Sequence, residues 1–293
     1  MRAVVSVCDR TALDPGAVGD SPLGRDRVHA AAAELAELAG NHQLVITYGT
    51  APQLELLLEE SAERKREQGL DVLGAESGAA VGFLLAQELG NQLARDRIAL
   101  LLTQVRVDPS DPEFRSPGLA VGTRVDESEA RRLAALRGWL MRPEDGGYRR
   151  VVPSPTPLAV VEADTIALLL ASDVVVVCGG GGGIPVVADY AGQLHSVAAV
   201  VSHELASAVL AEQLNADRLV LLTDDPPGLL DRHNLDVRTL VDVRKAVAAD
   251  PSLRLFRAAC HFVDASRRKA SIGSLHDARA VIDGDHGILV VPE

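Results

Sequence analysis

The chain has 293 residues, of which 47% are hydrophobic and 24% are charged. These proportions are ordinary for a soluble globular protein, and they exclude a disordered chain, a collagen-like fibre and a small disulfide-bonded scaffold. The formal net charge is −12, which repels nucleic-acid phosphates and anionic membrane surfaces. We therefore expect neither nucleic acid nor a membrane as a partner.

The cysteines and histidines give no sign of a metal site or a disulfide framework. Cys8, Cys178 and Cys260 lie far apart without a Cys-x-x-Cys pair, and no His-Glu-x-x-His motif is present. No apolar run approaches the ~18 residues that a membrane span needs. We expect a cytoplasmic protein without a tightly bound metal.

Short β-branched runs alternate with longer segments of helical periodicity, as in a parallel sheet that helices cover on both faces. The expected strands are Ala3–Cys8, Gln43–Thr47, Ile98–Val105, Asp173–Cys178, Ser196–Val201, Arg218–Thr223 and Gly287–Val291. The expected helices are Asp26–Leu38, Pro52–Gln68, Glu76–Leu93, Glu162–Leu170, Glu204–Leu214 and Ser252–Asp264. We predict a single domain over residues 1–293.

One stretch, about 108–157, departs from this alternation. Prolines punctuate it around a single predicted helix at Ser128–Leu140. We predict that this stretch protrudes from the sheet as a subdomain.

A run of five glycines, Gly179 to Gly183, directly follows the apolar strand that ends at Cys178. Consecutive glycines can turn their N–H groups toward an anion, and without Cβ atoms a phosphate can approach closely. A flexible surface loop is the alternative. The run is not a P-loop, since no Lys is near, and Ile184-Pro185 breaks the dinucleotide fingerprint.

Taken together, several segments resemble the carbamate kinase family, a branch of the amino acid kinase fold. The resemblance extends over nearly the whole chain in the family's order. It rests on Leu70-Asp71-Val72-Leu73-Gly74-Ala75-Glu76-Ser77, Leu102-Thr103-Gln104-Val105, Tyr148-Arg149-Arg150-Val151-Val152-Pro153-Ser154-Pro155, Gly180-Gly181-Gly182-Gly183-Ile184-Pro185, Leu210-Ala211-Glu212-Gln213-Leu214-Asn215-Ala216-Asp217, Leu222-Thr223-Asp224 and Ile272-Gly273-Ser274-Leu275.

The resemblance implies a three-layer αβα sandwich with a mainly parallel central sheet, a protruding subdomain and a homodimer. It implies reversible phosphoryl transfer between MgATP and carbamate, with carbamoyl phosphate and ADP on the other side. On the matching positions, it assigns a small phosphorylated anion to Gly49, Thr50, Gly180, Gly181, Gly182 and Gly183. It assigns the nucleotide, weakly bound as Mg-ATP or Mg-ADP, to Thr223 and Asp224.

The chain departs from the family pattern where that pattern has lysines. Those positions hold Leu119, His203 and Leu255, and the only lysines are Lys65, Lys245 and Lys269. Arg124, Arg254, Arg257 and a protonated His203 are the candidates for supplying the missing positive charge, although a guanidinium differs from an ammonium in reach and geometry. For His203-Glu204, the alternative is that Glu204 only complements the dipole of a helix.

Two hypotheses therefore remain. The chain is a carbamate kinase-type phosphotransferase with altered cationic groups, or it is a non-catalytic homologue that regulates or scaffolds an unidentified protein partner. In either case we expect the glycine loop to bind an anion. The Glu76–Leu93 helix is apolar over more than one face, which predicts either a homodimer contact or burial within one subunit.

Overall fold

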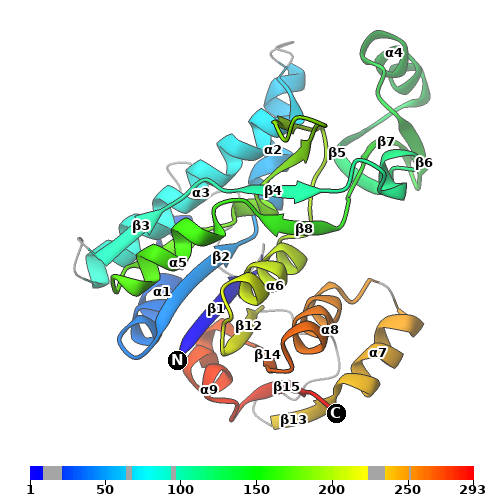
Figure 1. Ribbon diagram of the computed structural model, residues 1–293. Coiled ribbons are helices and arrows are strands. Elements are labelled where there is room, and N and C mark those ends of the chain that lie inside the picture. The colour runs from blue at the N-terminus through cyan, green and yellow to red at the C-terminus, as the bar shows by residue number, and fades with distance from the viewer. Residues whose placement is uncertain (9–21, 64–67, 94–96, 224–234, 251) are drawn as a thin grey trace.

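The computed structural model describes residues 1–8, 22–63, 68–93, 97–223, 235–250 and 252–293. In this part of the chain the largest sheet has eight strands (Figure 1). Their spatial order is β13 (Leu235–Thr239), β15 (Gly287–Val291), β14 (Lys269–Gly273), β12 (Arg218–Leu222), β1 (Arg2–Val7), β2 (Gln43–Tyr48), β9 (Val175–Cys178) and β3 (Ile98–Leu100). Neighbouring strands pair in parallel except β14 with β15. The predicted α/β class with a mainly parallel sheet is confirmed.

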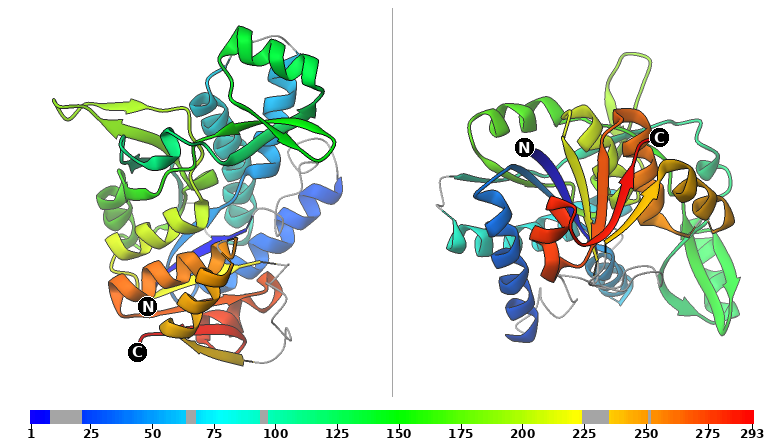
Figure 2. Two further views of the ribbon diagram at one scale, coloured as in Figure 1. Left: turned by 90° about the vertical axis from the view of Figure 1, so that its right-hand side faces the viewer. Right: turned by 90° about the horizontal axis from the view of Figure 1, so that it is seen from below.

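Helices cover both faces of this sheet. Successive side chains of each strand point to opposite sides, and the apolar side chains on each side are buried beneath helices. Ala3, Val5 and Val7 of β1 join one core, whereas Val4 joins the other. The first core is closed by α1 (Pro22–Ala39), α3 (Leu70–Gln92) and α9 (Ala278–Asp283). The second is closed by α5 (Ala163–Ala171), α6 (His203–Gln213), α7 (Leu240–Ala249) and α8 (Arg254–Ser266). The two helical layers are visible on either side of the sheet in Figure 2.

The strand expected over Ile98–Val105 is instead two strands in different sheets. After β3 the chain turns at Thr103 and continues as β4 (Gln104–Val107). The Thr103 hydroxyl accepts a hydrogen bond from the Gly179 N–H at 3.1 Å, and its carbonyl accepts one from the Ile184 N–H at 2.9 Å. These bonds fix the turn beside the glycine loop.

The second sheet has the order β11 (Leu194–Ser196), β10 (Ile184–Ala188), β4 and β8 (Pro157–Val160). The strand expected over Ser196–Val201 is wrong in position. Strand β11 ends at Ser196, and the Val197 N–H bonds to the Pro185 carbonyl at 3.0 Å as the chain leaves the sheet. The apolar residues that suggested a strand, such as Val201, are buried against β4 instead.

A third sheet lies apart from the main one, at the upper right of Figure 1. It has the order β5 (Leu119–Val125), β7 (Gly147–Val152) and β6 (Met141–Glu144), and α4 (Glu127–Arg137) connects β5 to β6. Val121 and Val152 pack against Leu54 of α2 (Ala51–Glu63) and Leu73 of α3. The sheet is thereby joined to the body of the molecule through α2.

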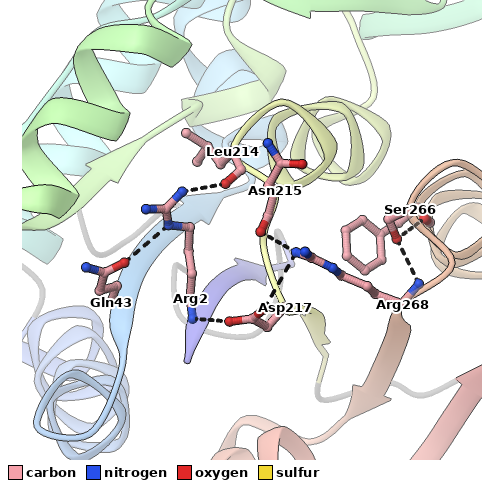
Figure 3. A network of polar contacts seen from close by, with 8 residues as sticks. Arg2, Gln43, Leu214, Asn215, Asp217, Ser266 and Arg268 are labelled. Atoms are coloured by element: carbon pink, nitrogen blue, oxygen red, sulfur yellow. Dashed lines mark hydrogen bonds and ion pairs between the residues drawn. The ribbon is translucent and has the colours of Figure 1, made fainter.

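The amino ends of the strands are held together by a polar network (Figure 3). Arg2 donates to the Leu214 carbonyl at 2.6 Å and to Gln43 at 3.2 Å, while its N–H donates to Asp217 at 2.8 Å. Arg268 pairs with Asp217 at 3.6 Å and donates to the Asn215 carbonyl. This network closes the edge of the sheet opposite the carboxyl ends, which are left to form the site.

No helix within the described ranges has the length and apolar character needed to cross a bilayer.

Candidate functional site

A cavity of about 840 Å³ lies beside the carboxyl ends of the central strands. Ligands of open α/β sheets bind at this edge. The first residues of α2, α6 and α8 all line the cavity, and the amino end of a helix favours negative charge. Its remaining lining includes Arg27, Leu119, Val121, Arg149, Ser154, Thr156 and Gly181.

The glycine loop forms the inner part of this wall. Gly179, Gly181, Gly182 and Gly183 all have positive φ, which side chains other than Gly rarely adopt. The loop's own hydrogen bonds use the N–H groups of Gly179, Gly182 and Gly183. Among the described residues, no hydrogen bond uses the N–H of Gly180 or Gly181. These two donors can therefore serve an anion.

The loop is packed too tightly to be a flexible surface segment. A Cβ on Gly181 would lie 2.5 Å from the Thr50 hydroxyl, and one on Gly182 would lie 2.7 Å from the Val201 carbonyl. A Cβ on Gly180 would lie 2.7 Å from the Tyr48 ring. The structure therefore contradicts the alternative interpretation, a flexible surface loop.

The segment after β2 supports the glycine loop. Gly49 is anchored by its N–H on the Val7 carbonyl at 2.9 Å, and the buried Thr50 hydroxyl lies 3.2 Å from the Ser77 hydroxyl. Tyr48 donates to the Gly78 carbonyl at 2.8 Å, and burial raises the pKa of its phenol. Tyr48 thus remains a neutral packing surface for Gly180.

Ser202, His203 and Glu204 begin α6 at the cavity wall. The Ser202 hydroxyl caps the helix by accepting from the Leu205 N–H, and it donates to the Glu204 carboxylate at 2.5 Å. His203 Nδ1 lies 3.5 Å from the same carboxylate. Burial alone would raise the pKa of Glu204, but His203, Ser202 and Arg254 together lower it. Glu204 is therefore ionised although it is buried. Its contacts with His203 and Ser202 go beyond the interaction with the helix dipole that any acidic residue at a helix start would make.

Arginines supply the positive charge of the cavity. Arg254 and Arg257 stand one helical turn apart at the start of α8, and both are exposed toward the cavity. Arg149 of β7 enters from the third sheet and pairs with Glu55 at 3.2 Å. Among the described residues, no lysine lines this cavity.

Comparison with known proteins agrees with this architecture. The amino acid kinase family model matches residues 16–250. Carbamate kinase from Rhizobium meliloti is 36% identical over 99% of this chain and 93% of its own, and that from Haemophilus influenzae is 34% identical over 98% and 96%. The chain belongs to the carbamate kinase family.

Solved structures give the same result. A protein from Aeropyrum pernix K1 superposes with a TM-score of 0.91 at 34% identity, covering all of both chains. Carbamate kinase from Giardia lamblia bound to AMP-PNP superposes with a TM-score of 0.87 at 29% identity, covering 100% of this chain and 98% of its own.

The three positions to which the resemblance assigns family lysines have different surroundings. Leu119 and His203 line the cavity. Leu255 instead packs against the second core, and its neighbours Arg254 and Arg257 line the cavity in its place. Within the described residues, the cavity thus has no lysine but retains positive charge from Arg254 and Arg257 of α8.

The predicted nucleotide residues are only partly described. Thr223 follows β12, is 7% exposed, and donates its N–H to the Gly273 carbonyl at 2.8 Å. It is not among the residues that line the large cavity. Asp224 lies outside the described residues. Gly180 and Gly183 line a smaller hollow next to the large cavity, and Gly181 borders both.

Several site residues are absent from the sequence-based prediction. Glu55, Arg149 and Tyr48 are not among the predicted site residues, and each acts through a partner distant in the chain. The Tyr148-Arg149-Arg150 segment was available as a family match, but nothing in it indicates which arginine faces the cavity.

Proposed function

We propose that the chain is a carbamate kinase-type phosphotransferase that moves a phosphoryl group between a nucleoside diphosphate and a small carboxylate acceptor such as carbamate. The proposal is carried by one observation. The start of α6, Arg254, Arg257 and Gly181 converge on one cavity at the carboxyl edge of the sheet, and Gly180 lines the small hollow beside it. Among the described residues, the N–H groups of Gly180 and Gly181 take part in no hydrogen bond.

The roles follow from the chemistry of phosphoryl transfer, in which the protein mainly positions the reactants and neutralises charge. In the ATP-forming direction, the bond between phosphorus and the carbamate oxygen breaks as a terminal oxygen of the nucleoside diphosphate attacks. The glycine N–H groups bind oxygens of the phosphoryl group. Arg254 and Arg257 neutralise its charge, and the Thr50 hydroxyl lies next to Gly181 to donate a further hydrogen bond.

We expect turnover to be slow. Loss of one preorganised donor to the developing charge typically costs about 10²–10³ in rate. Leu119 offers no charge at the cavity wall, and Leu255 is turned into the core. The arginines restore charge but not the compact, mobile ammonium of a lysine.

The second candidate is a non-catalytic homologue that binds the anion and regulates or scaffolds a partner. The apolar Leu119 on the cavity wall favours it, because an uncharged side chain there does not assist phosphoryl transfer. Both candidates retain the anion site, so only turnover separates them.

The nucleotide, its Mg²⁺, the dimer and the compartment are part of the same proposal. The Giardia lamblia carbamate kinase structure with AMP-PNP supports a nucleotide as co-substrate, which would bring its own Mg²⁺.

On α3, Val81 and Leu85 are buried within the subunit whereas Phe83 is 56% exposed, and this supports a homodimer through the outer face of the helix. The buried thiol of Cys178 and the half-buried thiol of Cys260 suit a reducing cytoplasm.

The decisive experiment is an ATP-formation assay with carbamoyl phosphate and MgADP, coupled to a second ATP-consuming enzyme. The control is the same protein with both Arg254→Ala and Arg257→Ala. Slow ATP formation that the double variant abolishes supports the phosphotransferase. Equal background signals from both proteins, with phosphate binding intact, would establish the non-catalytic homologue instead.

A further inference from the structure

Three side chains from two distant parts of the chain meet beside the cavity, which two of them, His203 and Glu204, line. A ligand atom of Cys8, one of His203 and one of Glu204 all lie within 4.8 Å of one another. The side chains of His203 and Glu204 are 5% and 6% exposed, and Cys8 is half-buried. Thiol, imidazole and carboxylate are the side-chain groups that bind Zn²⁺ in proteins.

The backbone holds these residues firmly in place. Cys8 directly follows β1, and its N–H donates to the Leu222 carbonyl of the neighbouring strand at 2.9 Å. His203 and Glu204 occupy the first turn of α6, which the Ser202 hydroxyl caps. The strand end and the helix start are adjacent because α6 packs on β1 in the fold.

The histidine has an unused nitrogen. Within the described part of the molecule, His203 Nε2 is buried and has no hydrogen-bond partner. Its Nδ1 lies 3.5 Å from Glu204 Oε2. A buried polar nitrogen without a partner is unfavourable, and in native proteins it calls for an explanation. A metal ion bound at Nε2 is one such explanation, because Nε2 then gains a ligand bond while Nδ1 keeps its contact with Glu204.

We infer that Cys8, His203 and Glu204 form a binding site for Zn²⁺ or a similar borderline-soft divalent cation. Thiolate and imidazole select zinc and cobalt over the hard ions Mg²⁺ and Ca²⁺, which prefer oxygen ligands. Three protein ligands leave the fourth tetrahedral position open toward the cavity that His203 and Glu204 line. With zinc bonds of about 2.0–2.3 Å, ligand atoms lie about 3.5 Å apart, so the three groups must draw together by about 1 Å.

The surrounding charges permit such an ion. A thiolate and a carboxylate together balance a divalent cation. The Ser202 hydroxyl, bonded to Glu204 at 2.5 Å, orients the carboxylate as outer-shell partners of metal ligands do. Arg254 and the positive end of α6 oppose a cation here, but the two anionic ligands lie closer to it.

The resemblance assigns a lysine to the position that His203 occupies. An ion bound there would place positive charge on the same wall of the cavity. Sequence patterns predict no metal site, because the ligands come from two segments almost two hundred residues apart and form no motif. The inference concerns binding of the ion alone, and it holds whether or not the chain transfers phosphoryl groups.

The test is metal binding by the full-length protein after removal of metals with a chelator. Zn²⁺ affinity is measured by competition with a chromophoric chelator, and Co²⁺ is added separately as a spectroscopic probe. We expect tight binding of one ion per chain, a thiolate-to-cobalt charge-transfer band and the intense visible bands of tetrahedral cobalt. Millimolar Mg²⁺ should not compete.

The variants Cys8→Ser and His203→Gln should weaken Zn²⁺ binding at least about a hundredfold, beyond the range that outer-shell changes produce. Matched controls are Cys260→Ser and His261→Gln, a neighbouring cysteine and histidine on α8, where His261 lies 3.2 Å from Glu212. Both controls should leave affinity and spectrum unchanged.

The inference is overturned if Zn²⁺ binds the original protein no better than the folded Cys8→Ser variant, or if the charge-transfer band is lost in Cys260→Ser. If Cys8→Ser does not fold, Glu204→Gln and the cobalt spectrum of the original protein decide the matter, since an octahedral spectrum without a thiolate band excludes the site. ATP formation is measured in parallel, so failure of zinc binding and failure of phosphoryl transfer are read separately.

Discussion

The guanidinium of Arg149 and the carboxylate of Glu55 lie 3.2 Å apart although the two residues are separated by 94 positions in the chain. Arg149 also donates to the Gly122 carbonyl at 2.7 Å, and the Gly122 N–H donates to Glu55 at 2.6 Å. Glu55 belongs to α2, whereas Arg149 and Gly122 belong to the third sheet. The pair therefore fastens that sheet to the body of the molecule at the edge of the cavity.

We predict that Arg149→Ala lowers the free energy of unfolding by about 1–2 kcal/mol, because a half-buried carboxylate is left without its charged partner. Chemical denaturation followed by circular dichroism measures this change. Arg142→Ala is the control, since Arg142 is an exposed arginine of the same sheet and donates to the Pro117 carbonyl rather than to a carboxylate. Equal effects of the two substitutions would contradict a special role for the pair.

The pH dependence of stability offers a second prediction about Glu55. Burial raises the pKa of this carboxyl above its ordinary value of 4.5, and Arg149 and the Gly122 N–H reverse this only in part. A carboxyl with a higher pKa in the folded state holds its proton more tightly when folded. Its contribution to stability is therefore full below pH 4.5 and is lost as the pH rises through the folded pKa.

Glu55→Gln cannot ionise and should lack this loss. We expect the stability of the variant relative to the original protein to increase as the pH is raised from about 4 to 7. Denaturant titrations at several pH values measure the difference. Glu76→Gln, which alters an exposed glutamate on α3, should show no such trend. A relative stability of Glu55→Gln that is independent of pH would contradict the raised pKa.

The sequence predicts those features that local composition encodes. The alternation of elements and the family motifs indicate the α/β fold. The glycine run predicts a loop, because glycine adopts positive φ angles that other residues rarely adopt. The turn at Thr103 is not predictable in this way, because no Gly or Pro interrupts Ile98–Val105 and the break depends on bonds to Gly179 and Ile184. Likewise, which of Arg254, Leu255 and Arg257 faces the cavity depends on how α8 packs against the sheet.

The glycine loop provides a direct test of anion binding. Gly181→Ala places a Cβ 2.5 Å from the Thr50 hydroxyl at a φ of +63°, so the loop or Thr50 must move. We expect phosphate affinity, measured by calorimetry, to fall at least about tenfold as the N–H donors lose their alignment.

Gly192→Ala is a matched control for this substitution. Its φ is +79°, so it carries a similar backbone penalty, but its Cβ would meet no atom within 4 Å. Phosphate binding should be unchanged in this variant. If both variants bind phosphate as the original protein does, the glycine loop is not the anion site.

The proposed homodimer can be tested at Phe83, which is 56% exposed on α3. We predict that the protein sediments as a dimer at micromolar concentration and that Phe83→Asp shifts it to monomer, because a charge would be buried in the contact. Leu136→Asp on α4 is the control, since Leu136 is 69% exposed on the third sheet's helix and should not affect assembly. A monomeric original protein would refute the dimer.

The final prediction concerns the two leucines that stand where the resemblance assigns lysines. Leu119 lines the cavity, so Leu119→Lys would place an ammonium there while its methylene stem packs as the leucine does. Leu255 packs against the second core, so Leu255→Lys would bury a charge. We expect Leu119→Lys to raise the turnover number for ATP formation at least about tenfold, part of the 10²–10³ that one aligned donor contributes.

Leu255→Lys should instead lower the free energy of unfolding by about 2–4 kcal/mol without a gain in turnover. Leu119→Met, which keeps the volume but adds no charge, is the control for the first variant. Turnover is measured with the coupled assay and stability by denaturation of the same preparations. If folded Leu119→Lys turns over no faster than Leu119→Met, then a missing charge at this position is not what limits the reaction, and the explanation of slow turnover from the lysine positions fails.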